Sequence, residues 1–220
     1  MIASLTFLFS GVVAQAAPSP RAVAQDEPNA GAASDEYPEM EVAVGYSFLR
    51  VCPNCTFFND FYMNGGGGAF VYNVKSWIGV KGEFVGYTTA GGFKKQLANL
   101  GVAGASGNLF TYTFGPQVKK QWGKFRPFGE FLVGAAHSNA YAKIFSAEKG
   151  ALNTSGSQNA FAMQFGAGLD YVLNKRIQIR PAEIDCLYTR FGANSIPNYS
   201  GTQHSFKYVA GLNFTFGIKN

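Results

Sequence analysis

Hydrophobic and polar residues alternate with a period of two in eight stretches of the chain. The clearest stretch is the last one, and its apolar positions are Phe206, Tyr208, Ala210, Leu212, Phe214 and Phe216. The positions between them are small or polar, among them Lys207 and Asn213. A side-chain period of two predicts a β-strand with one apolar and one polar face. Its length of about eleven residues suits a tilted strand that crosses a membrane.

Seven earlier stretches repeat this pattern. The eight predicted strands are Val42–Arg50, Gly68–Val74, Trp77–Tyr87, Leu109–Lys119, Phe125–His137, Ala160–Val172, Ile177–Phe191 and Phe206–Phe216. In the seventh strand the alternation would place Arg180 on the apolar face. We therefore expect a β-bulge near Pro181, because one extra residue shifts the alternation and proline cannot donate to the ladder.

The connections between the predicted strands alternate between long and short. The long ones cover residues 51–66, 88–108, 138–159 and 192–203, and the short ones cover 75–76, 120–124 and 174–176. Residues 64–68, Asn-Gly-Gly-Gly-Gly, are interpreted as a flexible loop that leads into the second strand. This arrangement predicts an all-β protein, an eight-stranded antiparallel up-and-down transmembrane β-barrel over residues 41–220.

Composition favours the membrane barrel over its soluble alternative, a lipocalin-like barrel of eight up-and-down strands. Charged residues make up 14% of the chain, aromatic residues make up 15%, and there are 27 glycines. A soluble barrel would carry many charges outside and an apolar interior. Here the charges are few, and several fall in the middle of strands, where a tight polar interior would pair them.

The N-terminal region shows two further segments. Residues 1–17 are predicted to be a signal peptide, with cleavage as late as residue 24. Residues 18–40 are rich in proline, alanine and acidic residues and are predicted to form a flexible leader. The rest of the chain is basic. Because a secreted chain rarely meets nucleic acid, we expect its basic residues to bind anionic lipid head groups and not nucleic acid.

Two sequence segments resemble the small outer-membrane β-barrel superfamily, the group of the outer membrane protein A-like transmembrane domain and the opacity-type proteins. They are the terminal Gly211–Phe216 and the segment Arg126–Ala136. The resemblance implies a porin-like cell-envelope protein in the outer membrane of a Gram-negative bacterium, monomeric, with both termini periplasmic. It also implies three partners: outer-membrane lipids, lipopolysaccharide and the outer-membrane assembly machinery. Leu212, Phe214 and Phe216 would be the assembly signal, although the chain ends in Gly-Ile-Lys-Asn and not on the aromatic residue.

Charged residues within the predicted strands are the main candidates for a functional site. Lys81, Glu83, Glu130, Glu183, Asp185 and Lys207 fall on the polar faces. We expect them to form a charge network across the lumen, which would plug the barrel. The alternative is a narrow or gated pore for small solutes whose conductance these charges set. Eight strands leave little width for a steady water-filled channel.

Cysteines and histidines suggest structural roles. Cys52 and Cys55 are predicted to form a disulfide in the first long loop, because secreted proteins meet an oxidising compartment. Cys186 is expected on the lipid face. The pairs His137-Ser138 and His204-Ser205 raise the alternative of a lipid A-modifying enzyme, but adjacent residues in a strand point to opposite faces. We therefore expect no catalytic residue, no metal and no cofactor.

Basic and aromatic residues gather near the short turns. The basic ones are Lys75, Lys119, Lys120, Lys124, Arg126, Lys175 and Arg176. They are expected to anchor the barrel at the membrane surface or to contact lipid phosphates or peptidoglycan. Tyr72, Trp77, Tyr87 and Trp122 are expected in aromatic girdles. The predicted function is a structural or surface-interaction role, with exposed loops on a plugged barrel.

Overall fold

The structure is a computed structural model that describes residues 36–52, 59–99, 106–140, 157–191 and 202–219. These residues form a closed barrel of eight antiparallel strands, each paired with its neighbours in the sequence. The strands are β1 (Tyr37–Cys52), β2 (Phe61–Lys75), β3 (Ile78–Thr89), β4 (Asn108–Lys119), β5 (Phe125–Ser138), β6 (Gln158–Val172), β7 (Ile177–Thr189) and β8 (Gln203–Lys219). A helix, α1 (Gly91–Asn99), follows β3. The predicted fold class is confirmed.

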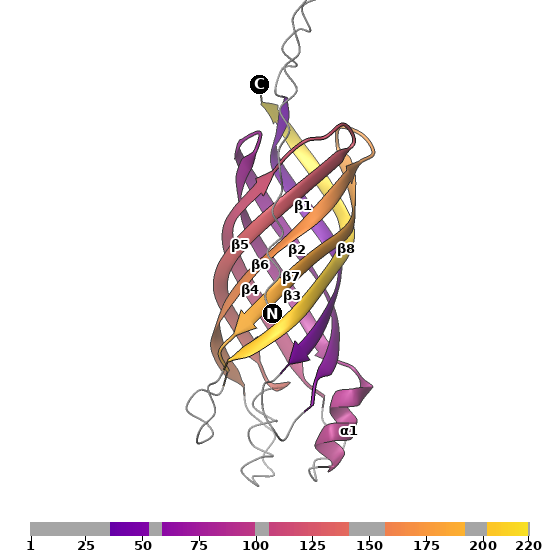
Figure 1. Cartoon of the computed structure of the whole chain (residues 1–220), viewed down its shortest axis with the longest axis vertical. Coiled ribbons are helices and arrows are strands. Elements are labelled where there is room, and N and C mark those ends of the chain that lie inside the picture. The colour runs from indigo at the N-terminus through magenta and orange to yellow at the C-terminus, as the bar shows by residue number, and fades with distance from the viewer. Residues whose placement is uncertain (1–35, 53–58, 100–105, 141–156, 192–201, 220) are drawn as a thin grey trace, which may run out of the picture. The chain divides into compact units, whose positions relative to one another are not determined.

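The barrel has two different ends (Figure 1). One end carries the short connections that follow β2, β4 and β6, together with the C-terminal end of β8; we call it the turn end. The other end carries α1 and the strand ends that the long connections join, and we call it the loop end. The predicted alternation of long and short connections is confirmed. The predicted signal peptide lies outside the described residues, and β1 begins at Tyr37, inside the predicted leader.

The prediction of a glycine-rich loop was wrong, because residues 64–68 lie within β2 and pair with both β1 and β3. Gly65 and Gly67 point into the barrel. A Cβ at Gly65 would overlap the carbonyl oxygen of Gly86, and a Cβ at Gly67 would overlap that of Phe84. Only glycine permits this close approach of two strand backbones. The first long connection is therefore shorter than predicted.

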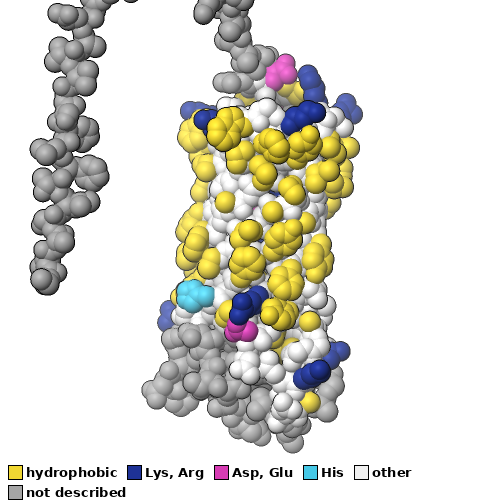
Figure 2. Space-filling view, turned by 45° about the vertical axis from the view of Figure 1, so that its right-hand side comes forward, with side chains coloured by type: hydrophobic (Ala, Val, Ile, Leu, Met, Phe, Trp, Pro, Cys, Tyr) yellow, Lys and Arg dark blue, Asp and Glu magenta, His cyan; other side chains and the backbone are white. Residues whose placement is uncertain are grey.

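The outer face of the barrel is apolar (Figure 2). Hydrophobic side chains cover its middle, and lysine and arginine side chains gather at the turn end. Exposed apolar residues come from all eight strands and include Val44, Phe70, Phe84, Phe114, Phe131, Phe165, Ile184 and Phe206. Such a belt is what a membrane-spanning barrel presents to lipid. Among the described residues, no helix has the length and hydropathy that crossing a bilayer requires.

The predicted β-bulge is confirmed in β7. The register of β7 against β8 shifts between Arg180 and Glu183, so that two residues lie between them where β8 has one. Both side chains consequently point into the barrel and are buried. The hydroxyl of Tyr208 donates to the carbonyl oxygen of Pro181 at 2.7 Å, which satisfies a backbone group that the bulge removes from the ladder.

Candidate functional site in the barrel lumen

The lumen contains two sections of different chemistry. The section from the turn end to the middle of the barrel holds buried charged side chains, and we call it the charged section. The section at the loop end holds buried apolar side chains, and we call it the apolar section. The side chains of both sections come from inward-facing positions on the strands, so the alternation of each strand decides what enters the lumen.

The structure places all six predicted lumen residues inside the charged section. Lys81 Nζ lies 2.9 Å from Glu130 Oε1, 3.1 Å from Glu183 Oε1 and 3.0 Å from Glu83 Oε2. Lys207 Nζ lies 3.1 Å from Asp185 Oδ2 and also contacts Glu83 Oε1. Lys81 is 0% exposed and Lys207 is 1% exposed. Two ammonium groups are thus surrounded by four carboxylates.

Arg180 extends this cluster toward the turn end. Its guanidinium donates to Asp170 at 2.7 and 2.9 Å and to Glu183 Oε2 at 2.6 Å. Glu183 therefore accepts from Arg180 with one oxygen and from Lys81 with the other. The bulge of β7 is what brings Arg180 and Glu183 to the same face. Of all the carboxylates in the section, Glu183 joins the largest number of basic partners, since it also lies 3.5 Å from Lys207.

A third group of charges closes the turn end of the lumen. Glu41 Oε1 accepts from Lys119 at 2.8 Å and from Arg126 at 3.1 Å. Asn213 donates to Glu41 at 2.8 Å and to Asp170 at 3.3 Å, which links this group to Arg180. The prediction that Lys119 and Arg126 lie at the membrane surface was wrong. Both occupy inward positions at the ends of their strands and are buried against Glu41.

The charges of the two signs nearly cancel within the described part of the lumen. The basic side chains are Lys81, Lys119, Arg126, Arg180 and Lys207, and the acidic ones are Glu41, Glu83, Glu130, Asp170, Glu183 and Asp185. Two glutamines add neutral donors, Gln117 to Glu130 and Gln164 to Glu83, each at 3.0 Å. Asp185 is ion-paired with Lys207, yet neither of its oxygens accepts a well-aligned hydrogen bond. It is the least satisfied carboxylate of the section.

The carboxylates of Glu83, Glu130 and Glu183 lie within 4.8 Å of one another, which is close enough to hold a metal ion. The ammonium of Lys81 already contacts all three. A divalent cation would have to displace this lysine, so the arrangement is an internal ion cluster and not an open metal site.

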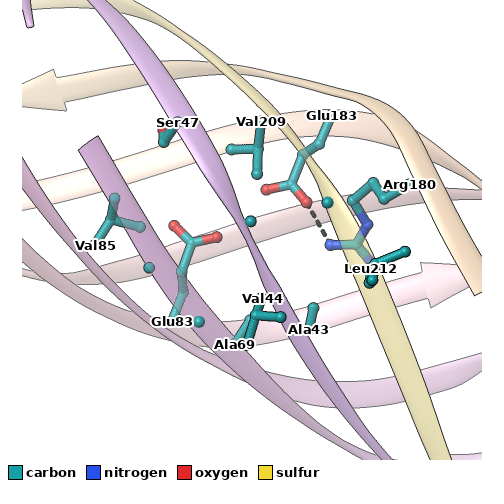
Figure 3. A pocket seen from close by; sticks show the side chains of 14 residues that line it. Ala43, Val44, Ser47, Ala69, Glu83, Val85, Arg180, Glu183, Val209 and Leu212 are labelled. Carbon is teal, nitrogen blue, oxygen red and sulfur yellow. Dashed lines mark hydrogen bonds and ion pairs between the residues drawn. The ribbon is translucent and has the colours of Figure 1, made fainter. Parts of the chain in front are cut away.

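A small cavity adjoins the charged section (Figure 3). Its volume is about 20 Å³, which is room for about one water molecule. Glu183 and Arg180 face each other on one side of it, and Glu83 lies on another. Gly45, Gly67 and Gly211 also line it.

The apolar section was not predicted. Its buried residues are Leu49, Val51, Phe61, Met63, Val85, Tyr87, Leu109, Ala136, Ala162 and Leu187 from the strands, with Phe93, Ala140 and Phe191 from outside them. The ring of Phe93 in α1 lies 5.0 Å from the ring of Phe61. The Gln203 side chain holds the backbone of Phe191 in place with hydrogen bonds of 2.9 and 3.0 Å. Side chains therefore fill the loop end as well.

The other predicted residues have varied outcomes. Tyr87 lies inside the barrel, where its hydroxyl is 3.0 Å from that of Ser47, so its placement in a girdle was wrong. Cys55 lies outside the described residues, and the disulfide stays a prediction; the Cys52 thiol lies 3.4 Å from Asp60 Oδ2. Leu212, Phe214 and Phe216 all lie on the outward face of β8.

In each of the two His-Ser pairs, the histidine and the serine point to opposite faces of their strand, as adjacent strand residues do. His137 Nδ1 is 2.7 Å from Asn159 Oδ1 on the outer face, whereas Ser138 is buried. His204 is exposed and packs edge-to-face on Tyr188, whereas Ser205 is buried. Neither histidine can therefore reach the serine next to it.

Comparisons with known proteins give information on the fold alone. No model of a protein family and no curated protein sequence matches the chain. Neisserial surface protein A has a similar structure, with a TM-score of 0.57, 9% identity, and coverage of 82% of this chain and 99% of that one. The attachment invasion locus protein of Yersinia pestis matches at a TM-score of 0.49 and 15% identity, over 81% of this chain and 99% of that one. The fold of the chain is the one found in small outer-membrane β-barrel proteins, as the sequence resemblance predicted.

Proposed function

We propose that the protein is a bacterial outer-membrane barrel that does not conduct and does not catalyse, and whose role is structural or one of surface interaction through its long connections. The barrel would anchor the loop end at the cell surface, with both termini in the periplasm. The apolar belt and the fold support the membrane location.

The observation that carries this proposal is the filled lumen. Lys81 and Glu183 are buried in the middle of the barrel, and Leu49, Phe61 and Phe93 are buried at its loop end. A solute that entered from the loop end would have to displace apolar side chains first and break several ion pairs next. Breaking one buried pair costs about 3–5 kcal/mol.

Single-channel recording in planar bilayers tests the proposal against the narrow pore. We expect the inserted full-length barrel to show no stable conductance at any voltage, while a change in gel mobility on boiling shows that the sample was folded. Conductance steps of constant size would overturn the proposal. Lys207→Gln and Lys75→Gln form a matched pair for that case, because Lys207 lies in the lumen and Lys75 is exposed on the turn end. A pore that uses the lumen would change its ion selectivity only in the first variant.

The orientation of the barrel in the outer membrane can be tested separately. An epitope inserted into residues 141–156 should be accessible to antibody on intact cells, and one inserted into residues 120–124 should become accessible only after the outer membrane is permeabilised. The reverse result would place the turn end outside.

An enzymatic role in lipid A modification predicts a changed acylation pattern. Since His137 and His204 point away from their neighbouring serines, we expect the mass spectrum of lipid A to be the same with and without the protein. A lost or added acyl chain would contradict this expectation.

A further inference from the structure

A groove on the outer wall at the turn end combines an apolar floor with an unpaired basic side chain. Its volume is about 360 Å³, and its lining includes Trp77, Val118, Lys120, Pro127 and Gly129. Val118 and Trp77 are half exposed to the surroundings of the barrel. The groove thus lies where the apolar belt meets the charged rim of the turn end.

Backbone hydrogen bonds fix the geometry of this groove. The Lys120 amide donates to the Pro127 carbonyl at 3.0 Å, and the Lys119 amide donates to the Trp77 carbonyl at 2.8 Å. Beyond them, Trp122 and Phe125 exchange hydrogen bonds of 2.7 and 2.9 Å and close the hairpin. Lys120 therefore extends from a rigid hairpin beside the floor of the groove.

Charge identifies the kind of ligand. Two basic residues on the outer surface of the turn end have acidic partners, since Lys175 pairs with Glu36 and Lys219 pairs with Glu39. Within the part of the chain that the structure describes, Lys120 has no acidic partner and lies 5.8 Å from the ring of Trp122. An ammonium group above an apolar groove at a membrane surface attracts an anionic head group that carries an acyl chain.

A larger groove on the barrel wall does not have this property. It lies over β6, β7 and β8, has a volume of about 780 Å³, and is lined by Phe165, Cys186 and Phe206. Its basic residue, Arg50, already binds Asp60 at 2.9 Å. Its positive charge is neutralised, so this groove is not selective for an anion.

We propose that the groove around Lys120 binds one anionic glycerophospholipid, with the phosphate at Lys120 and an acyl chain along Val118 and Gly129. This inference rests on the proposed membrane location. Trp77 would lie against the glycerol region of the lipid, which is the level that tryptophan prefers at a membrane surface.

The two tryptophans of the chain, Trp77 and Trp122, allow a direct test because both lie at this end. The full-length barrel is folded into phosphatidylcholine vesicles that contain a fixed fraction of either dibromo-phosphatidylglycerol or dibromo-phosphatidylcholine. Bromine quenches tryptophan fluorescence on contact. Trp122→Phe leaves Trp77 as the reporter. We expect the anionic lipid to bind next to Trp77 about fivefold more strongly than the zwitterionic one, the factor that ~1 kcal/mol per lysine corresponds to.

Two matched pairs of variants locate the site. Lys120→Gln should abolish the preference, whereas Arg176→Gln, at an exposed basic residue in another turn, should retain it. Gly129→Leu should fill the groove, because a Cβ there would lie 3.7 Å or more from its neighbours. Gly82→Leu is its control, since a Cβ at Gly82 has no neighbour within 4 Å and Gly82 does not line the groove.

Equal quenching by the two lipids would overturn the inference, as would equal effects of Lys120→Gln and Arg176→Gln. In either case, quenching by dibromo-phosphatidylcholine would still show that the barrel lies in the bilayer. The absence of quenching by both lipids would instead contradict the membrane location on which the inference rests.

Discussion

The charged and apolar sections fill the same narrow tube by different means. In the charged section, Lys81, Arg180 and Lys207 bind several carboxylates each, and every ion depends on partners from other strands. In the apolar section, residues such as Leu49 and Leu109 contribute by packing. A buried charge that loses its partner pays the full cost of desolvation, whereas a truncated apolar residue leaves only a cavity. The two sections should therefore respond differently to small changes.

The largest effect is expected from Glu183→Gln. This change removes one carboxylate charge from Lys81, Arg180 and Lys207 at once, and leaves Asp170 as the one carboxylate paired with Arg180 in the described part of the lumen. We expect a loss of ~3–5 kcal/mol in the free energy of unfolding, measured by urea titration of the folded barrel in lipid vesicles. Glu36→Gln, which breaks the exposed pair with Lys175, is the control and should leave the midpoint unchanged. Equal midpoints for both variants would mean that the buried network does not stabilise the barrel.

Leu109→Ala tests the apolar section and should have a smaller effect. Leu109 is 2% exposed inside the loop end, and its truncation should cost ~2–4 kcal/mol in the same titration. Val118→Ala on the outward face of the same strand is the control, since lipid can follow the altered surface and no cavity forms. If the two variants lost the same stability, the loop end would not be a packed core.

Deletion of Pro181 should have the smallest effect of the three. The bulge adds one residue between Arg180 and Glu183, and its removal restores a regular alternation that still points both side chains inward. The main loss is the hydrogen bond from Tyr208, which is worth ~1 kcal/mol.

Deletion of Phe131 is the comparison for Pro181. It lies in a regular part of β5 between the inward residues Glu130 and Leu132. Its loss would exchange the inward and outward side chains in one part of the strand. We therefore expect no folded barrel, and unboiled and boiled samples should migrate alike on a detergent gel. If the variant that lacks Pro181 did not fold, the bulge itself would be required, and the inward direction of Arg180 and Glu183 would not be sufficient.

The sequence was sufficient to predict the barrel and the position of the bulge, because a period of two is a local property. It also identified the lumen charges that stand in the middle of strands, such as Lys81 and Glu130. It did not identify the partners at strand ends. Lys119 and Arg126 share the alternation of the inward Gln117 and Glu130, but they stand next to turns and were therefore expected at the membrane surface. Their common partner, Glu41, lies on another strand and is found only from the three-dimensional structure.

The apolar section was missed for a related reason. Leu49, Leu109 and Leu187 lie on the faces that carry polar residues elsewhere in the same strands. We treated each strand face in the sequence as polar or apolar along its whole length, and this assumption does not allow an inward face to change from polar to apolar along the strand. Phe61 and Met63 were hidden by the glycine run that follows them, which was interpreted as a loop. Whether glycine serves a turn or a close approach of strands is decided by the neighbouring strand, and the local sequence does not contain that information.

The pairing of β1 with β8 has a consequence for folding. It joins Tyr37 to Lys219 at one end and Cys52 to His204 at the other, so the residues in contact are separated by almost the whole barrel sequence. Contacts of such long sequence separation form slowly, because the chain must lose most of its freedom before they can form. Until β8 arrives, β1 and β7 each have an unpaired row of backbone groups, which the interior of a bilayer does not tolerate. The barrel can therefore become stable in the membrane only after β8 has been synthesised and has paired with β1.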